Sequence, residues 1–309
     1  MPSSRLRFYG QTPCVQHGDK IGVIAPSGPF DHSAFEAGLA LLSNYFQVHT
    51  SDDIRSATGY LAGSDQRRLG ELNRFLREPD LTAIIAARGG YGAMRLLPGL
   101  DLDALRTHPK LLVGFSDITA LHAQWQRYDL VSLHAPMVAG IGKAERRLQA
   151  RWLAALCGEF SSNPLQGLTP LVQGRASGRL VGGNLAVLCA LLGTPFMPPL
   201  KGRVLLLEDI GEAPYRVDRL LTQLQLSGQL QQVAAVLVGA FTVSNPGPAG
   251  VTVEEVIAQR LAELSVPVLT GLPVGHISDN LEIPLGAQAH VDAYRGEVRF
   301  DAPGRLSGP

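Results

Sequence analysis

The chain has 309 residues, of which 45% are hydrophobic, so it is long enough for two domains or for one large domain with a substantial core. Lys and Arg together number 27, and so do Asp and Glu, which leaves no formal net charge to attract nucleic acid or an anionic membrane surface. No apolar run has the length of a signal peptide or a membrane span, so we expect a soluble, cytoplasmic protein whose partner is a small molecule or a peptide.

The first half of the chain alternates short apolar runs with segments of helical spacing. The spacing predicts helices over 33–45 and 66–76 and a third that starts after Ser116 and runs through Tyr128. Apolar runs predict strands over 20–26, 46–50, 81–87 and 130–134, and another that begins at Leu111 and ends before the turn at Ser116. This alternation predicts a mostly parallel, doubly wound α/β sheet, with ligands bound at the carboxyl ends of its strands.

The segment LLVGFSDITAL, residues 111–121, is the first candidate for chemistry. It reads as a buried strand, a tight turn at Ser116 and the start of a helix, which is how a nucleophilic serine is presented. The match to G-x-S-x-G is partial, because Gly114 precedes Ser116 but Ile118 stands at the second glycine position. The alternative interpretation is an ordinary helix cap, since Ser and Asp are common there.

A glycine cluster, Arg88-Gly89-Gly90-Tyr91-Gly92-Ala93, ends the strand predicted at 81–87. It lies at the same end of the sheet as Ser116. Because glycine permits positive φ and close backbone approach, these N–H groups can face an anion or a developing oxyanion. The spacing matches no phosphate-binding motif, and a plain tight turn stays the alternative.

Residues 158–177 are loop-like in composition and predict a linker between an N-terminal domain, 1–157, and a C-terminal domain, 178–309. Beyond the linker the sequence predicts further strands and helices and, at 287–300, an antiparallel pair. The strands are expected at 178–181, 201–208, 233–241 and 266–271, and the helices at 185–192, 214–226 and 253–264. We expect a smaller α/β domain with a β-barrel-like sheet.

A serine nucleophile needs a base, and eight histidines are available. His276 is the first choice, because GLPVGHISDN places it in a Gly- and Pro-containing loop directly after a buried strand. His134, at the carboxyl end of a strand, is the second. His122 lies on the helix that follows Ser116 and is expected to point away from it, and the other five are expected at the surface.

An acid must orient the base, and Glu208 closes the apolar strand that ends in Leu207. Strand alternation sends Asp209 to the opposite face, so only one of the two faces the site. The alternative interpretation is that Glu208 and Asp209 are solvated charges that form ion pairs with Arg216 or Arg219.

No metal site is expected, because no cluster of His, Cys, Asp or Glu residues has the spacing of metal ligands. The three cysteines are widely separated, which argues for a reducing compartment.

Six segments resemble, in the same order and at similar intervals, the motifs of the L,D-carboxypeptidase family of serine peptidases, and most closely those of the murein tetrapeptide type. They are VIAPSGP, ARGGYGA, GFSDITAL, GGNL, LLLEDIGEAPYRVDRLL and GLPVGHISDN, and they span nearly the whole chain. The resemblance implies release of the terminal D-alanine from a muropeptide tetrapeptide, in cytoplasmic recycling of peptidoglycan. It also implies a homodimer without metal or other cofactor.

The same resemblance implies the roles of individual residues. Ser116 would be the nucleophile, Glu208 the orienting acid and His276 the general base, and the backbone N–H groups of Asp117 and Gly90 would form the oxyanion hole. A carboxypeptidase also holds a free carboxylate, for which the guanidinium of Arg88 is well shaped. Gly89, Tyr91 and Asn184 are expected beside it in the substrate site.

Two other functions remain open from the sequence. A microcin-immunity branch of the family acts on aminoacyl-nucleotide antibiotics, and the interval between Ser116 and Glu208 looks short for that branch. The other is a non-catalytic module that binds muropeptides or other small anions through the same residues.

Overall fold

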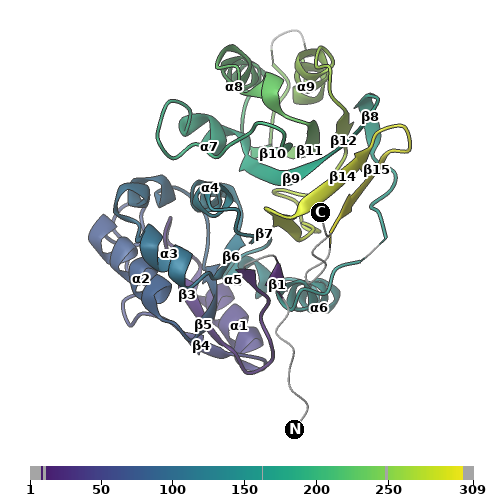
Figure 1. The fold of residues 1–309 in the computed structure, drawn as a ribbon. Helices are drawn as coiled ribbons and strands as arrows, with labels where there is room; N and C mark the ends of the chain where they lie inside the picture. Colours follow the sequence, from purple (N-terminus) through teal and green to yellow (C-terminus); the bar gives the residue numbers. More distant parts are fainter. Residues whose placement is uncertain (1–7, 10–11, 162, 248–249, 302–309) are drawn as a thin grey trace. The chain divides into compact units, whose positions relative to one another are not determined.

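The computed structural model describes residues 8–9, 12–161, 163–247 and 250–301 (Figure 1). The backbone divides into two compact units, the first ending at Phe160 and the second running from Ser161 to Asp301. Within the described residues, no helix combines the length and the apolar character that a membrane crossing requires.

The first unit is built on parallel strands in the order β7-β6-β5-β3-β4. These strands are β3 (Lys20–Ile24), β4 (Gln47–His49), β5 (Leu81–Ala86), β6 (Leu111–Gly114) and β7 (Ser132–His134), and a separate antiparallel pair is formed by β1 (Phe8–Tyr9) and β2 (Thr12–Pro13). The helices are α1 (His32–Ser43), α2 (Asp65–Arg77), α3 (Leu102–Thr107), α4 (Thr119–Arg127), α5 (Val138–Ile141) and α6 (Arg146–Leu156), with 3₁₀ helices η1 (Ala93–Gly99) and η2 (Ser116–Ile118).

Helices cover both faces of this parallel sheet because successive side chains of a strand point to opposite faces. Ile21 and Val23 of β3 share one core cluster with Phe35 of α1. Gly22, between them, faces α2, where a β-carbon would lie 2.9 Å from the ring of Phe75. The doubly wound α/β fold predicted for this half of the chain is therefore confirmed.

The second unit holds a mixed sheet in the order β15-β14-β9-β10-β11-β12-β8. Strands β9 to β12 are mutually parallel, whereas β8, β14 and β15 pair antiparallel with their neighbours. The strands of this sheet are β8 (Thr169–Val172), β9 (Arg175–Asn184), β10 (Val204–Ile210), β11 (Ala235–Thr242), β12 (Val268–Thr270), β14 (Gln288–Asp292) and β15 (Glu297–Phe300). The short strand β13 (Ile283–Leu285) also belongs to this unit but lies outside the seven-stranded sheet. The helices are α7 (Leu185–Ala190), α8 (Pro214–Leu226) and α9 (Val253–Leu261), with a short 3₁₀ helix η3 (Leu230–Gln232).

The sheet of the second unit curls into a half-barrel with a separate core on each face. Leu205 and Leu207 of β10 belong to one core cluster with residues of α7, α8 and α9. These three helices lie together on one side of the sheet (Figure 1). Leu206 of the same strand packs on the other face with residues of β14 and β15, such as Val291 and Val298. The expected barrel-like α/β fold is thus present, with a half-barrel in place of a closed one.

The sequence predicts a linker at 158–177, whereas the structure places β8 and the first residues of β9 in this segment. The loop-like interpretation is therefore wrong for Thr169–Val172. Among the described strands, β8 lies at the edge of the sheet beside β12, and it is at most partly buried. Thr169 and Pro170 are exposed and only Leu171 and Val172 pack against the core, so this edge strand lacks the apolar alternation by which strands are recognised.

Candidate active site

Ser116 lies on a tight turn between β6 and α4, as the sequence predicts. Its φ is +63°, a left-handed conformation that is uncommon and costly for a residue other than glycine. Glycine at 114 makes the turn possible, because a β-carbon there would lie 2.9 Å from the side chain of Ile118. No side chain caps η2 or α4 in this described segment, so the helix-cap interpretation of Ser116 is wrong.

The glycine cluster approaches Ser116 at close range. A β-carbon at Gly89 would lie 3.1 Å from the Cβ of Ser116 and 3.2 Å from its Oγ. Gly90 has a φ of +114°, which only glycine adopts freely. Across the described residues, neither the Gly90 N–H nor the Asp117 N–H donates a hydrogen bond to protein, so both remain available to a ligand.

The two other residues predicted to bind substrate from this cluster lie at its surface. Arg88 is exposed, and its Nη1 donates to the carbonyl oxygen of Pro29 at 2.6 Å, which leaves further guanidinium N–H donors for a ligand. The ring of Tyr91 is half exposed and packs edge-on against Tyr60, with ring centroids 5.7 Å apart.

His122 and His134 are both interior residues of the first unit. The two ring nitrogens of His122 contact Ser132 Oγ at 2.8 Å and the carbonyl oxygen of Gly114 at 2.9 Å. Complete burial lowers the pKa of His122 to about 3, so the ring is neutral at physiological pH. His134 packs beside Phe115, with ring centroids 5.6 Å apart.

In the second unit, the structure brings Glu208 and His276 together. Glu208, near the end of β10, is fully buried, and its Oε2 lies 2.8 Å from Nδ1 of His276. The imidazole side chain keeps 16% of its surface exposed. A carboxylate on Nδ1 fixes the tautomer that leaves Nε2 to accept a proton, which is the arrangement a general base requires.

Two glycines make room for the Glu208 side chain. A β-carbon at Gly239 would lie 3.2 Å from the Cβ of Glu208, and one at Gly275 would lie 2.8 Å from its Oε2. Gly275 also has a φ of +123°, and its N–H donates to Asn280 Oδ1 at 2.9 Å. The residue before His276 is therefore held in place by both backbone conformation and a buried hydrogen bond.

The carboxylate of Asp209 binds the N-terminal end of α7. It accepts hydrogen bonds from Asn184 Nδ2 at 2.8 Å and from the backbone N–H groups of Ala186 and Ile210. Burial raises the pKa of Asp209. Because Glu208 and Asp209 are both buried, the interpretation of the pair as solvated surface charges is wrong.

Asn184 is the N-cap residue of α7, the helix that Asp209 also contacts. Its Oδ1 accepts the N–H of Val187 at 3.1 Å and caps α7, while its Nδ2 binds Asp209. The predicted role of Asn184 in substrate binding stays a prediction. The capping role has a signal in the sequence, because an asparagine directly before an apolar helical run is a common N-cap.

The sequence-predicted site residues thus fall into two groups. Ser116, Asp117 and the glycine cluster belong to the first unit, and Glu208, His276 and Asn184 belong to the second. Among the residues that the structure describes, no group of three or more His, Cys, Asp or Glu side chains has an arrangement suited to a metal ion.

Comparison with known protein families matches both units. Residues 21–135 match the model of the LD-carboxypeptidase N-terminal domain, and residues 177–291 match that of the LD-carboxypeptidase C-terminal domain.

Individual relatives match along most of the chain. A probable murein peptide carboxypeptidase of Bacillus subtilis is 37% identical over 93% of this chain and 93% of its own length. The microcin C7 self-immunity protein of Escherichia coli is 27% identical over 89% of this chain and 91% of its own. The crystal structure of a muramoyltetrapeptide carboxypeptidase from Oxalobacter formigenes superposes with a TM-score of 0.81 at 31% identity, covering 92% of this chain and 98% of that one.

Proposed function

Because the chain belongs to the LD-carboxypeptidase family, peptidase S66, we propose that it removes the terminal D-alanine from murein tetrapeptide. The bond cut is the one between the L-centre of the third residue and the D-residue. The observation that carries this proposal is the contact between the buried Glu208 carboxylate and Nδ1 of His276. The names of the Bacillus and Oxalobacter relatives support a murein peptide as the substrate.

In the proposed mechanism, the Ser116 hydroxyl attacks the peptide carbonyl while His276 takes its proton. His276 then gives the proton to the departing amine of D-alanine, and water hydrolyses the acyl-enzyme by the reverse sequence. Glu208 holds the imidazole and stabilises its protonated form. The N–H groups of Asp117 and Gly90 stabilise the tetrahedral oxyanion, with each such donor contributing about 3 kcal/mol to the transition state.

The proposed roles divide between the units, with the nucleophile in the first and the acid and base in the second. Arg88 pairs with the free carboxylate of the substrate through guanidinium N–H groups other than the one that donates to Pro29. We place the enzyme in cytoplasmic peptidoglycan recycling and as a homodimer, in line with the family resemblance.

The test of the activity uses a chemically defined murein tetrapeptide and its all-L counterpart. We expect the enzyme to release alanine from the peptide with a D-terminus and not from the all-L peptide. Release from neither, or equal release from both, would overturn the proposal. An aminoacyl-sulfamoyl nucleoside offered in parallel tests the microcin-immunity alternative, which requires cleavage of that compound in preference to the tetrapeptide.

The role of Arg88 is tested by Arg88→Ala. We expect KM for the tetrapeptide to rise about tenfold with kcat nearly unchanged, because a carboxylate contact is made equally in the ground state and the transition state. Arg106→Ala removes another exposed arginine of the same unit and serves as the matched control. Equal KM values for the two variants would exclude Arg88 from carboxylate binding.

A further inference from the structure

The side chain of Asp117 is buried next to the proposed nucleophile and has no part in the mechanism above. Its Oδ2 accepts two hydrogen bonds, one from Ser27 Oγ at 2.6 Å and one from the backbone N–H of Ala93 at 2.8 Å. Ser27 follows β3, Ala93 ends the glycine cluster after β5, and Asp117 follows β6. One carboxylate oxygen therefore joins the loops that leave three neighbouring strands of the sheet.

These contacts hold the glycine cluster at both ends. At its start, the carbonyl oxygen of Gly89 accepts the N–H of Gly28 at 3.1 Å, and Gly28 directly follows Ser27. At its end, the N–H of Ala93 donates to Asp117. The segment between them contains Gly90, whose N–H is a proposed oxyanion donor.

A fully buried arginine supplies the positive charge for this arrangement. Arg68 of α2 binds the carbonyl oxygen of Pro26 and the carboxylate of Asp65. A β-carbon at Gly92 would lie 2.6 Å from Nη1 of Arg68, so the guanidinium packs directly under the glycine cluster. Burial raises the pKa of Asp117, and the charge of Arg68 together with the two hydrogen bonds opposes that rise.

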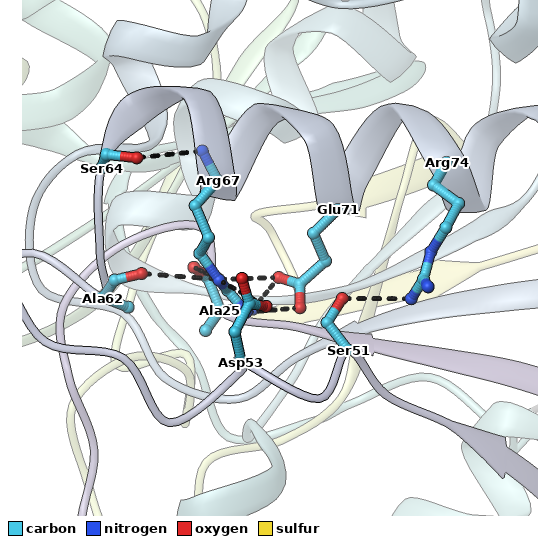
Figure 2. A network of polar contacts seen from close by, with 8 residues as sticks. All are labelled: Ala25, Ser51, Asp53, Ala62, Ser64, Arg67, Glu71 and Arg74. Carbon is cyan, nitrogen blue, oxygen red and sulfur yellow. Dashed lines mark hydrogen bonds and ion pairs between the residues drawn. The ribbon is translucent and has the colours of Figure 1, made fainter.

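The strand exit that carries Ser27 is anchored from the other side by the network in Figure 2. Glu71 of α2 accepts the N–H of Ala25 at 2.8 Å, and Arg67 binds Glu71 at 2.7 Å and Asp53 at 3.2 Å. Arg67 also donates to the carbonyl oxygen of Ala25 at 3.3 Å. The backbone two residues before Ser27 is therefore held by Glu71 and Arg67, and this positions the Ser27 hydroxyl that donates to Asp117.

We propose that the Asp117 side chain is a positioning group for the oxyanion hole. By binding Ser27 and the Ala93 N–H with one oxygen, it sets where the N–H groups of Gly90 and Asp117 lie relative to Ser116. The proposal rests on the proposed function for its kinetic consequence, although the ordering of the glycine cluster is independent of it.

The kinetic test uses Asp117→Ala, which removes the acceptor, and Ser27→Ala, which removes one donor. We expect kcat for the tetrapeptide to fall about 10²-fold in Asp117→Ala and less in Ser27→Ala, with KM within about twofold, because a small displacement of aligned donors acts on the transition state. Asp117→Asn keeps an acceptor oxygen and is expected to restore most of kcat.

The matched control is Asp101→Ala in the same unit. Asp101 also accepts one backbone N–H, from Ala104 at 2.9 Å, and one side-chain donor, Arg77 at 2.6 Å, but it caps α3. We expect Asp101→Ala to lose stability while kcat stays within about twofold. A fall in kcat no larger in Asp117→Ala than in Asp101→Ala would overturn the proposal.

Amide hydrogen exchange provides a readout that needs no substrate. We expect residues 89–93 to exchange at least about tenfold faster in Asp117→Ala and in Ser27→Ala than in the wild type, and unchanged exchange would overturn the proposal. Failure of the proposed function has a different signature, because the wild-type enzyme then releases no D-alanine while the exchange result still decides the role of Asp117.

Discussion

Two histidines of the second unit each contact a carboxylate, and the two pairs differ in burial and in the groups that surround them. In one, His276 meets the fully buried Glu208 at 2.8 Å. In the other, His290 bridges Ser177 Oγ at 2.9 Å and Asp301 Oδ1 at 3.0 Å, which has the appearance of a complete Ser-His-Asp set. Yet the side chains of His290 and Asp301 are 36% and 21% exposed.

The surface set lacks what a nucleophile needs. Ser177 lies inside β9 directly opposite His290 of β14, so the set is a cross-strand pair on an antiparallel ladder. Ser116, by contrast, lies on a turn with positive φ, beside the available N–H groups of Gly90 and Asp117. Hydrogen-bond distances between Ser, His and Asp therefore do not define an active site without a presented hydroxyl and oxyanion donors.

The largest effect is expected from replacing one of two serines with alanine: Ser116, the proposed nucleophile, or Ser177 of the surface set. Ser116→Ala should lower the rate of D-alanine release by about 10⁴-fold or more, because it removes the proposed nucleophile. Ser177→Ala should leave the rate within about twofold. A coupled D-alanine assay measures the rate for both variants. A large loss of rate in Ser177→Ala would indicate that Ser177, and not Ser116, is the catalytic serine.

The second largest effect is expected from replacing the carboxylates of the two pairs, Glu208 and Asp301, with amides. Glu208→Gln should lower kcat by about 10³- to 10⁴-fold, since the amide favours the wrong tautomer of His276. Asp301→Asn should change kcat by less than about twofold, and stability by less than about 1 kcal/mol, because that contact is solvated. Steady-state kinetics and urea unfolding measure the two effects. Similar kcat values for both variants would contradict the role of Glu208.

A smaller loss is expected from crowding Ser116. Gly89→Ala places a β-carbon 3.1 Å from the Cβ of Ser116, so either the serine or the glycine cluster must shift by a few tenths of an ångström. We expect kcat to fall about tenfold. Gly70→Ala, in the interior of α2 with nothing within 4 Å, should keep full activity and gain about 0.5–1 kcal/mol. A Gly89→Ala variant with the kcat of the wild type would contradict the close approach of the glycine cluster to Ser116.

The mildest prediction concerns stability at acid pH and uses His122, an interior histidine that contacts the carbonyl oxygen of Gly114 just before the turn at Ser116. The pKa of His122 is about 3 in the folded protein and about 6.5 in an unfolded chain, so only the unfolded chain binds the proton between these values. Each unit by which the pH falls within that range should therefore lower the free energy of unfolding by about 1.4 kcal/mol.

The measurement is urea unfolding of wild type and His122→Gln at several pH values from neutral to about 4.5. The stability of the wild type should decline more steeply than that of the variant as pH falls. His49→Gln, which replaces an exposed histidine, should follow the wild type. Parallel curves for wild type and His122→Gln would show that His122 does not titrate in this way.

Much of the fold follows from local pattern. The helix predicted over 214–226 is present as α8, Pro214–Leu226, because proline at its start and an apolar stripe along it are both local signals. The strand β8 was missed for the opposite reason. Thr169–Val172 is half exposed at a sheet edge, and it is a strand only because β12 lies beside it.

The sequence by itself determined the alternation of strands and helices, the turn at Ser116 and the family, since each is written in residues that are neighbours along the chain. The resemblance implied that Glu208 orients His276, but only the tertiary structure showed that contact and the one between Ser27 and Asp117. Glu208 and His276 are 68 residues apart, and Ser27 and Asp117 are 90 apart. Contacts of that kind depend on strand order and on the space that glycines such as Gly275 leave, and neither is encoded in a local pattern.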